Sequence, residues 1–118
     1  METDAPVLDP AALDKLLQLG GADFVREMVK MFFGYADERL TIARSALAAG
    51  RMAEIEPAIH PLKTSAGHVG AQAMSYFCQE IERNGRDEIW DPMPELLSAA
   101  EKSYAEVKPL LEARLETL

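Results

Sequence analysis

Residues 60–70 read HPLKTSAGHVG and place both histidines of the chain close to a lysine. Neutral imidazole is a nucleophile near neutral pH, and an ammonium group one helical turn away can lie beside it. Lys63 stands at that spacing from His60. Gly67 adds no bulk to the same surface, although a glycine inside a helix costs up to about 1 kcal/mol relative to alanine. A nucleophile, a cation and open space suit an anionic group that is accepted and passed on.

The apolar residues around this stretch predict the direction in which the histidine points. At about 100° per residue, one side of the helix collects the expected core residues, which are Ile55, Ile59, Leu62, Ala66 and Val69. His60 lies roughly 140° from that direction, with Lys63 at its flank. Thr64 and Gly67 follow along the same outer side. We therefore expect His60 to face solvent.

The second histidine does not complete a metal site with the first. On a helix His68 lies roughly 12 Å along the axis and some 80° around it from His60. Glu56 and His60 have the i, i+4 spacing of a chelating pair, but no matching Glu-x-x-His motif stands on another helix. We therefore expect neither a metal nor a cofactor. His68 is expected to interact with the carbonyl groups at the helix end, and contact with a partner is the alternative.

Composition excludes several classes of protein. The net charge is -8 and the twelve Lys and Arg residues are scattered, so nucleic-acid binding is not expected. No apolar run approaches the roughly 20 residues of a membrane span, and the first residues lack the pattern of a secretory signal, so we expect a cytoplasmic protein. Cys78, the only cysteine, follows an apolar helical spacing and is expected to be a buried thiol.

Hydrophobic periodicity predicts helices throughout and no strands. The expected helices are a short one from Asp9-Pro10 to Gly20-Gly21, then 23–49, 52–68, 71–83 closed by Asn84-Gly85, and 94–117. Amphipathic helices joined by short loops can bury their apolar faces only against one another. The predicted fold is all-α, an antiparallel up-down four-helix bundle with the short helix across one end. We expect residues 1–118 to form one monomeric domain, which is free-standing or, as the alternative, part of a larger kinase.

Three prolines are predicted to disturb these helices. Pro109 is expected to kink the last helix, because a proline in a helix interior loses a hydrogen bond and clashes with the preceding turn. Pro57 and Pro61 are expected to remove two successive hydrogen bonds beside His60. A local kink or 3₁₀ stretch is therefore predicted at the histidine.

The run HPLKTSAGHVGA, residues 60–71, resembles the signature of bacterial histidine-containing phosphotransfer (HPt) domains, His-x-Leu-Lys-Gly-Ser-Ala-Gly-x-Leu-Gly-Ala. The matching positions are His60, Leu62, Lys63, Ser65, Ala66, Gly67, Gly70 and Ala71. VLDPAALDKLLQLGG, MVKMFFGYADERLTIARSALAAG and FCQEIER resemble the family's other helices. The likeness thus extends over nearly the whole chain.

The resemblance implies a phosphorelay intermediate. His60 would accept a phosphoryl group through Nε2 from a receiver-domain aspartate and pass it to another receiver, while Lys63 steadies the phosphoryl oxygens. The implied partners are receiver domains of response regulators and a hybrid histidine kinase, and Mg²⁺ is expected only in the receiver. The chain has no Gly-rich phosphate loop, so we expect a phosphocarrier without autonomous kinase activity.

The chain departs from the family pattern at Thr64, which stands where glycine is typical and adds bulk on the docking side. Residues expected to contact a partner are Pro61, Thr64, Gly67, Met31 and Phe33, the last with packing at the core edge as an alternative. A helical adaptor that binds a receiver or kinase without accepting phosphate is the alternative function. The presence of His60 and Lys63 argues against it.

Overall fold

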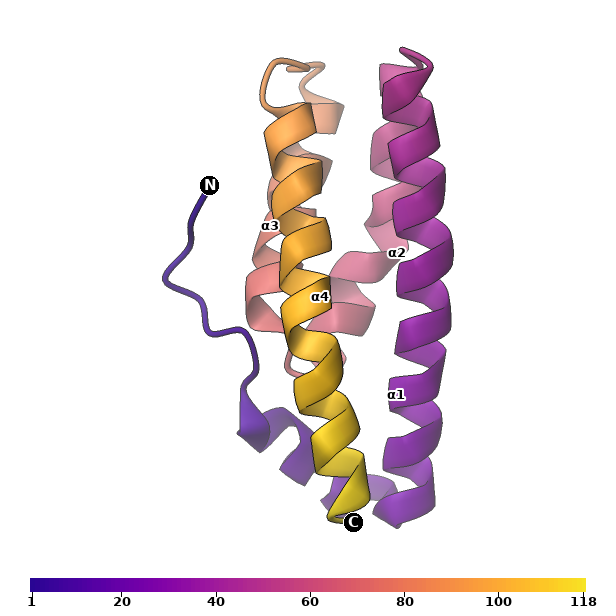
Figure 1. The fold of residues 1–118 in the computed structure, drawn as a ribbon, viewed down its shortest axis with the longest axis vertical. Helices are drawn as coiled ribbons and strands as arrows, with labels where there is room; N and C mark the ends of the chain where they lie inside the picture. The colour runs from indigo at the N-terminus through magenta and orange to yellow at the C-terminus, as the bar shows by residue number, and fades with distance from the viewer.

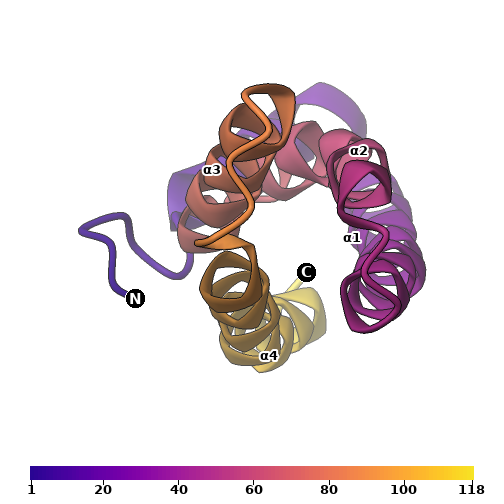
Figure 2. The same cartoon turned by 90° about the horizontal axis from the view of Figure 1, so that it is seen from above.

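The chain folds as a bundle of four helices. The computed structural model describes residues 1–118, and its elements in chain order are α1 (Pro10–Ala48), the 3₁₀ turn η1 (Met52–Glu54), α2 (Ile55–His68), α3 (Gln72–Arg86) and α4 (Met93–Glu116). Seen from above, they form a ring in which α1 contacts α2, α2 contacts α3, and α4 contacts both α3 and α1 (Figure 2). Short connections make successive helices antiparallel. The predicted all-α four-helix bundle is confirmed.

α1 contains a break at Gly21 that separates its two parts. The helix starts after Asp9, whose Oδ1 accepts a hydrogen bond of 3.1 Å from the N–H of Ala11. Gly21 has φ 84° and ψ -177°, a conformation that only glycine adopts readily. The part before Gly21 crosses the lower end of the bundle in Figure 1, and the longer part then runs to the opposite end. The short helix predicted across one end is confirmed.

Only one of the two prolines near the histidine removes a helical hydrogen bond. Pro57 is the third residue of α2, within the first turn, where N–H groups have no partner inside the helix. The expected loss of a hydrogen bond at Pro57 is therefore wrong. Pro61 lies inside the helix, and its carbonyl oxygen accepts a hydrogen bond of 3.2 Å from Ser65 Oγ. The 3₁₀ turn lies upstream, at Met52–Glu54, rather than at the histidine.

α3 continues beyond its predicted end, because its Asn84-Gly85 pair does not stop the helix. The Nδ2 of Asn84 donates a 2.8 Å hydrogen bond to the carbonyl oxygen of Glu80, within the helix. A Cβ added to Gly85 would lie 2.6 Å from the Cβ of Glu56 on α2. Glycine is thus required here for the close approach of two helices, and the extra turn includes Arg86.

The interior is one apolar cluster of 28 buried residues drawn from all four helices. The five residues predicted to point inward from α2 are all buried: Ile55, Ile59, Leu62, Ala66 and Val69. Cys78 is buried as well, and burial, with the nearby charge of Glu82, raises the pKa of its thiol to about 12. The thiol is therefore part of the core, as predicted. No helix is both long enough and apolar enough to cross a membrane.

Candidate functional site

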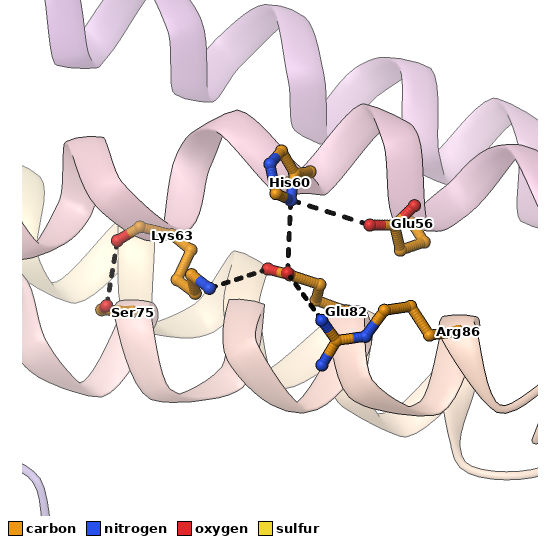
Figure 3. Close-up of polar contacts among 6 residues, drawn as sticks. All are labelled: Glu56, His60, Lys63, Ser75, Glu82 and Arg86. Carbon is orange, nitrogen blue, oxygen red and sulfur yellow. Dashed lines mark hydrogen bonds and ion pairs between the residues drawn. The ribbon is translucent and has the colours of Figure 1, made fainter.

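His60 projects from the outer side of α2, and its side chain is 62% exposed. The prediction that it faces solvent is confirmed. Its Nδ1 points toward α3 and lies 3.3 Å from Oε1 of Glu82 and 3.7 Å from Oε1 of Glu56 (Figure 3). The other ring nitrogen, Nε2, points away from these carboxylates. One face of the ring is thus held by the protein while the opposite nitrogen is open to a partner.

Glu82 lies at the centre of the site, between two cations and the histidine. Its side chain is only 5% exposed, with Lys63 Nζ 3.1 Å from Oε2 and an Arg86 guanidinium nitrogen 3.5 Å from Oε1. Burial acts to raise the pKa of this carboxyl, but the charges of Lys63, His60 and Arg86 outweigh burial and hold the pKa below its ordinary value. Glu82 is therefore ionised at neutral pH.

Lys63 lies one turn along α2 from His60, as predicted, and its side chain is 36% exposed. The ammonium group reaches across to Glu82 on α3 rather than extending into solvent (Figure 3). The backbone of Lys63 is also held by α3, because Ser75 Oγ donates a 3.0 Å hydrogen bond to the carbonyl oxygen of Lys63. Both the backbone and the ammonium group of the lysine are thus held by α3, beside the histidine.

The sequence reasoning did not identify Glu82 or Arg86. Glu82 directly follows Ile81 and lies one turn after Cys78, both buried core residues. A carboxylate next to the apolar side of an amphipathic helix was the signal that could have found it, because such groups are rarely buried without a partner. Arg86 lay beyond the expected end of the helix, so its place one turn after Glu82 could not be predicted.

The α2 residues that were expected to contact a partner protein lie on the outer side of that helix. Thr64 and Gly67 are exposed and Pro61 is half-buried. A Cβ added to Gly67 would meet only Ser75 Oγ, at an ordinary contact distance of 3.7 Å. No close contact within the chain therefore requires glycine at Gly67.

Met31 and Phe33 lie on different sides of α1. Met31 is 54% exposed and lines a small cavity with residues of α2, including Ser65 and His68. Phe33 instead faces α4, where its ring centroid lies 6.4 Å from that of Tyr104 and 5.4 Å from Lys108 Nζ. Because α4 is diagonally opposite α2 in Figure 2, Phe33 does not lie beside the histidine. Packing at the core edge was the correct alternative.

His68 does not make the contacts expected from its position at the end of α2. Its side chain is exposed and donates no hydrogen bond to the terminal carbonyl groups. It lines the same cavity as Met31, on the side of α2 that faces α1. His68 is thus separate from the group of charged residues around His60.

The bundle presents the exposed ring of His60 with a buried carboxylate behind it and a lysine one helical turn away. The model of the Hpt domain family matches residues 27–118, and the chain belongs to this family.

The solved structures that are similar to the chain include two histidine-containing phosphotransfer proteins. Histidine-containing phosphotransfer protein B (HptB) from Pseudomonas aeruginosa PAO1 superposes with a TM-score of 0.88 at 25% identity, covering 98% of this chain and 99% of HptB. The histidine-containing phosphotransfer protein MtHPt2 from Medicago truncatula has a TM-score of 0.79 at 22% identity, covering 94% of this chain and 80% of MtHPt2, and shares the fold. No curated protein matches the chain.

Proposed function

We propose that His60 is the phosphoryl acceptor of a phosphorelay intermediate, which takes the group from a receiver-domain aspartate and delivers it to another receiver. Membership of the Hpt family supports the carrier role. The observation that supports His60 is its geometry, an exposed ring whose Nδ1 lies 3.3 Å from the ionised Glu82. No observation supports the alternative of a non-phosphorylated adaptor.

Glu82 prepares the ring for attack. A carboxylate beside Nδ1 favours the tautomer with its proton on Nδ1, which leaves the lone pair on the outward Nε2. Nε2 attacks the phosphorus in line, the new P–N bond forms, and the P–O bond to the receiver's aspartate breaks with its electron pair staying on that carboxylate. The ring then carries a positive charge with Nδ1–H directed at Glu82, which stabilises it. Transfer onward reverses these steps.

Lys63 supplies the positive charge for the transferred group. A phosphoryl group carries about −1.5 to −2 charges at pH 7, and its oxygens accept hydrogen bonds from an ammonium. To reach them, the ammonium must turn from Glu82 toward the outer side of the ring. Arg86 lies 3.5 Å from Glu82 Oε1 and continues to compensate that carboxylate when Lys63 turns. Mg²⁺ is expected to come from the receiver.

The surface proposed to bind the receiver combines residues from two helices. Met31, Tyr35 and Ile42 are 54%, 42% and 43% exposed, and their spacing places them on one side of α1. Pro61 and Thr64 lie on the outer side of the neighbouring α2. We call these five residues the docking surface. Exposed apolar side chains on the helix that packs against the one carrying the reactive histidine are typical of a protein-binding site.

Incubation with phosphorylated receivers tests the acceptor. The wild-type protein is expected to take up label that is labile in acid and stable in alkali, as a phosphohistidine is. His60→Gln is expected to take up none, while His68→Gln, which changes the only other histidine, remains labelled. The proposal is wrong if His60→Gln is labelled as well as the wild type, or if no receiver in a broad panel labels the wild type.

A further inference from the structure

Three side chains around the histidine have the arrangement of metal ligands. Glu56, His60 and Glu82 each offer one ligand atom, and these atoms lie within 4.8 Å of one another. Nδ1 of His60 lies 3.3 Å from Glu82 Oε1 and 3.7 Å from Glu56 Oε1. A tetrahedral zinc ion with bonds of about 2.0–2.2 Å keeps its ligand atoms about 3.4 Å apart. The two separations from Nδ1 bracket that value, and the ligand atoms of the two carboxylates lie within 4.8 Å of each other, so an ion can be bound once the carboxylates close around it.

The two oxygens of Glu82 face different partners. Oε2 is inaccessible to solvent and pairs with Lys63 Nζ at 3.1 Å. Oε1 faces His60 Nδ1 at 3.3 Å and has only the Arg86 guanidinium, at 3.5 Å, as a positive neighbour. A buried carboxylate that keeps its charge gains free energy from each positive partner, and Oε1 is the oxygen directed at the other two members of the cluster. This carboxylate is the buried member of the three-residue cluster.

We propose that Glu56, His60 and Glu82 bind a divalent transition-metal ion such as Zn²⁺, and that the bound ion blocks phosphorylation of His60. Imidazole nitrogen and carboxylate oxygen are both donors that zinc accepts, and three protein ligands leave the fourth tetrahedral position to water. The histidine is 62% exposed and the Glu56 side chain 25% exposed, so an ion can enter from solvent. The blocking effect rests on the proposed function, whereas metal binding does not.

A bound metal ion blocks phosphorylation of His60 because the two nitrogens of the neutral imidazole ring share a single proton. A metal at Nδ1 takes the lone pair of that nitrogen, and the single proton of the neutral imidazole then resides on Nε2. Nε2 has no lone pair left to attack phosphorus. A phosphoryl group on Nε2 instead leaves Nδ1 carrying the proton, which occupies the metal position. Metal and phosphoryl group are therefore mutually exclusive on His60.

The surrounding charges limit the affinity and select the ion. Lys63 and Arg86 both lie beside Glu82 and oppose a second cation, so we expect affinity in the micromolar range, weaker than that of a structural zinc site. Mg²⁺ prefers oxygen ligands in octahedral geometry and dehydrates reluctantly. We therefore expect the site not to bind the Mg²⁺ that a receiver requires.

Titration of the protein with Zn²⁺ against a coloured zinc indicator tests binding without any phosphate chemistry. We expect one ion per wild-type chain, and a loss of affinity of roughly tenfold or more in His60→Gln, Glu56→Gln and Glu82→Gln. His68→Gln and Glu80→Gln are the matched controls, and neither should change affinity. Circular dichroism checks that each variant is folded, and ¹⁵N spectra should show a zinc-dependent shift of Nδ1 in His60 but not in His68.

Phosphoramidate, a small phosphoryl donor that needs no receiver, tests the block. Labelling of the wild type should fall by half at the Zn²⁺ concentration that half-fills the site, and millimolar Mg²⁺ should have no such effect. The proposal is overturned if His60→Gln binds zinc as tightly as the wild type, if micromolar zinc does not bind, or if zinc-saturated protein is labelled at the metal-free rate. Absence of labelling without metal would contradict the proposed acceptor instead, and the titration would still decide the metal site.

Discussion

Lys63 Nζ and the buried Glu82 carboxylate form an ion pair of 3.1 Å between α2 and α3. The lysine expected to neutralise a phosphoryl group is therefore already paired before that group arrives. The same carboxylate lies 3.3 Å from Nδ1 of His60. One acidic side chain thus fixes both the resting position of the lysine and the orientation of the nucleophilic ring.

Glu82→Gln is expected to slow phosphoryl transfer by roughly tenfold, equivalent to about 1.4 kcal/mol of transition-state stabilisation. The amide carries no charge to favour the proton on Nδ1 or to stabilise the phosphorylated ring. Initial rates of transfer from a phosphorylated receiver measure the effect, and ¹⁵N spectra of His60 measure the tautomer. A merely structural role would leave the tautomer unchanged. Glu80→Gln, on the same helix and paired with Arg83, is the control.

The depressed pKa of Glu82 predicts a loss of stability in acid. Because the native pKa lies below the ordinary value of 4.5, the unfolded state binds this proton at higher pH than the native state does. The contribution of Glu82 is therefore complete above the ordinary pKa and is lost as pH falls through the native pKa. Urea unfolding midpoints from neutral pH downward should fall less steeply in Glu82→Gln than in the wild type. Parallel curves for the two proteins would show that the carboxylate has no such linkage.

The sequence predicted the features that depend on a single helix. The 100° spacing of Ile55, Ile59 and Leu62 was enough to place His60 on the solvent side, because a helix turns every residue by the same angle. The break at Gly21 was likewise predicted from local signals. Such features need no knowledge of which helices become neighbours.

The parts that were not predicted depend on the register between helices. Gly85 was interpreted as a helix stop because the Asn-Gly pair is a local signal, whereas its contact with Glu56 exists only after α2 and α3 pack together. The partnership of Glu82 with His60 and Lys63 has the same origin. Phe33 lies at the edge of the apolar stripe of α1, and the approach of α4 decided its position.

Gly85→Ala is expected to destabilise the protein by about 1–3 kcal/mol, although alanine is the better helix former. The new Cβ would lie 2.6 Å from the Cβ of Glu56, so α2 and α3 must separate. Thermal unfolding measures the change. Gly34→Ala is the matched control, because an added Cβ there has no neighbour within 4 Å, and it should stabilise by about 0.5–1 kcal/mol. An equal gain in both variants would show that the interface at Gly85 can open without cost.

Pro61→Ala is expected to stabilise the protein by about 2 kcal/mol. It restores a hydrogen bond to the carbonyl oxygen of Pro57 and removes a ring clash, together nominally about 3 kcal/mol, offset by about 0.4–1 kcal/mol of added freedom in the unfolded chain. Pro57→Ala lacks the first effect, since Pro57 lies in the first turn of α2, and should destabilise by less than about 1 kcal/mol. Urea unfolding of the two variants compares them directly. Equal changes in stability would contradict the different roles assigned to the two prolines.

Thr64→Gly is expected to speed phosphoryl transfer or to widen the range of receivers that the protein serves. Thr64 is exposed on the outer side of α2, one residue after Lys63, so its methyl and hydroxyl groups lie on the surface proposed to bind the receiver. Transfer rates with several phosphorylated receivers measure the effect. Thr64→Ala separates bulk from helix stability, because alanine removes the two outer groups without the helix penalty of about 1 kcal/mol that glycine carries. If bulk limits docking, both variants should be faster than the wild type with at least one receiver. Unchanged kinetics of both variants across the whole panel would show that the receiver does not approach over Thr64.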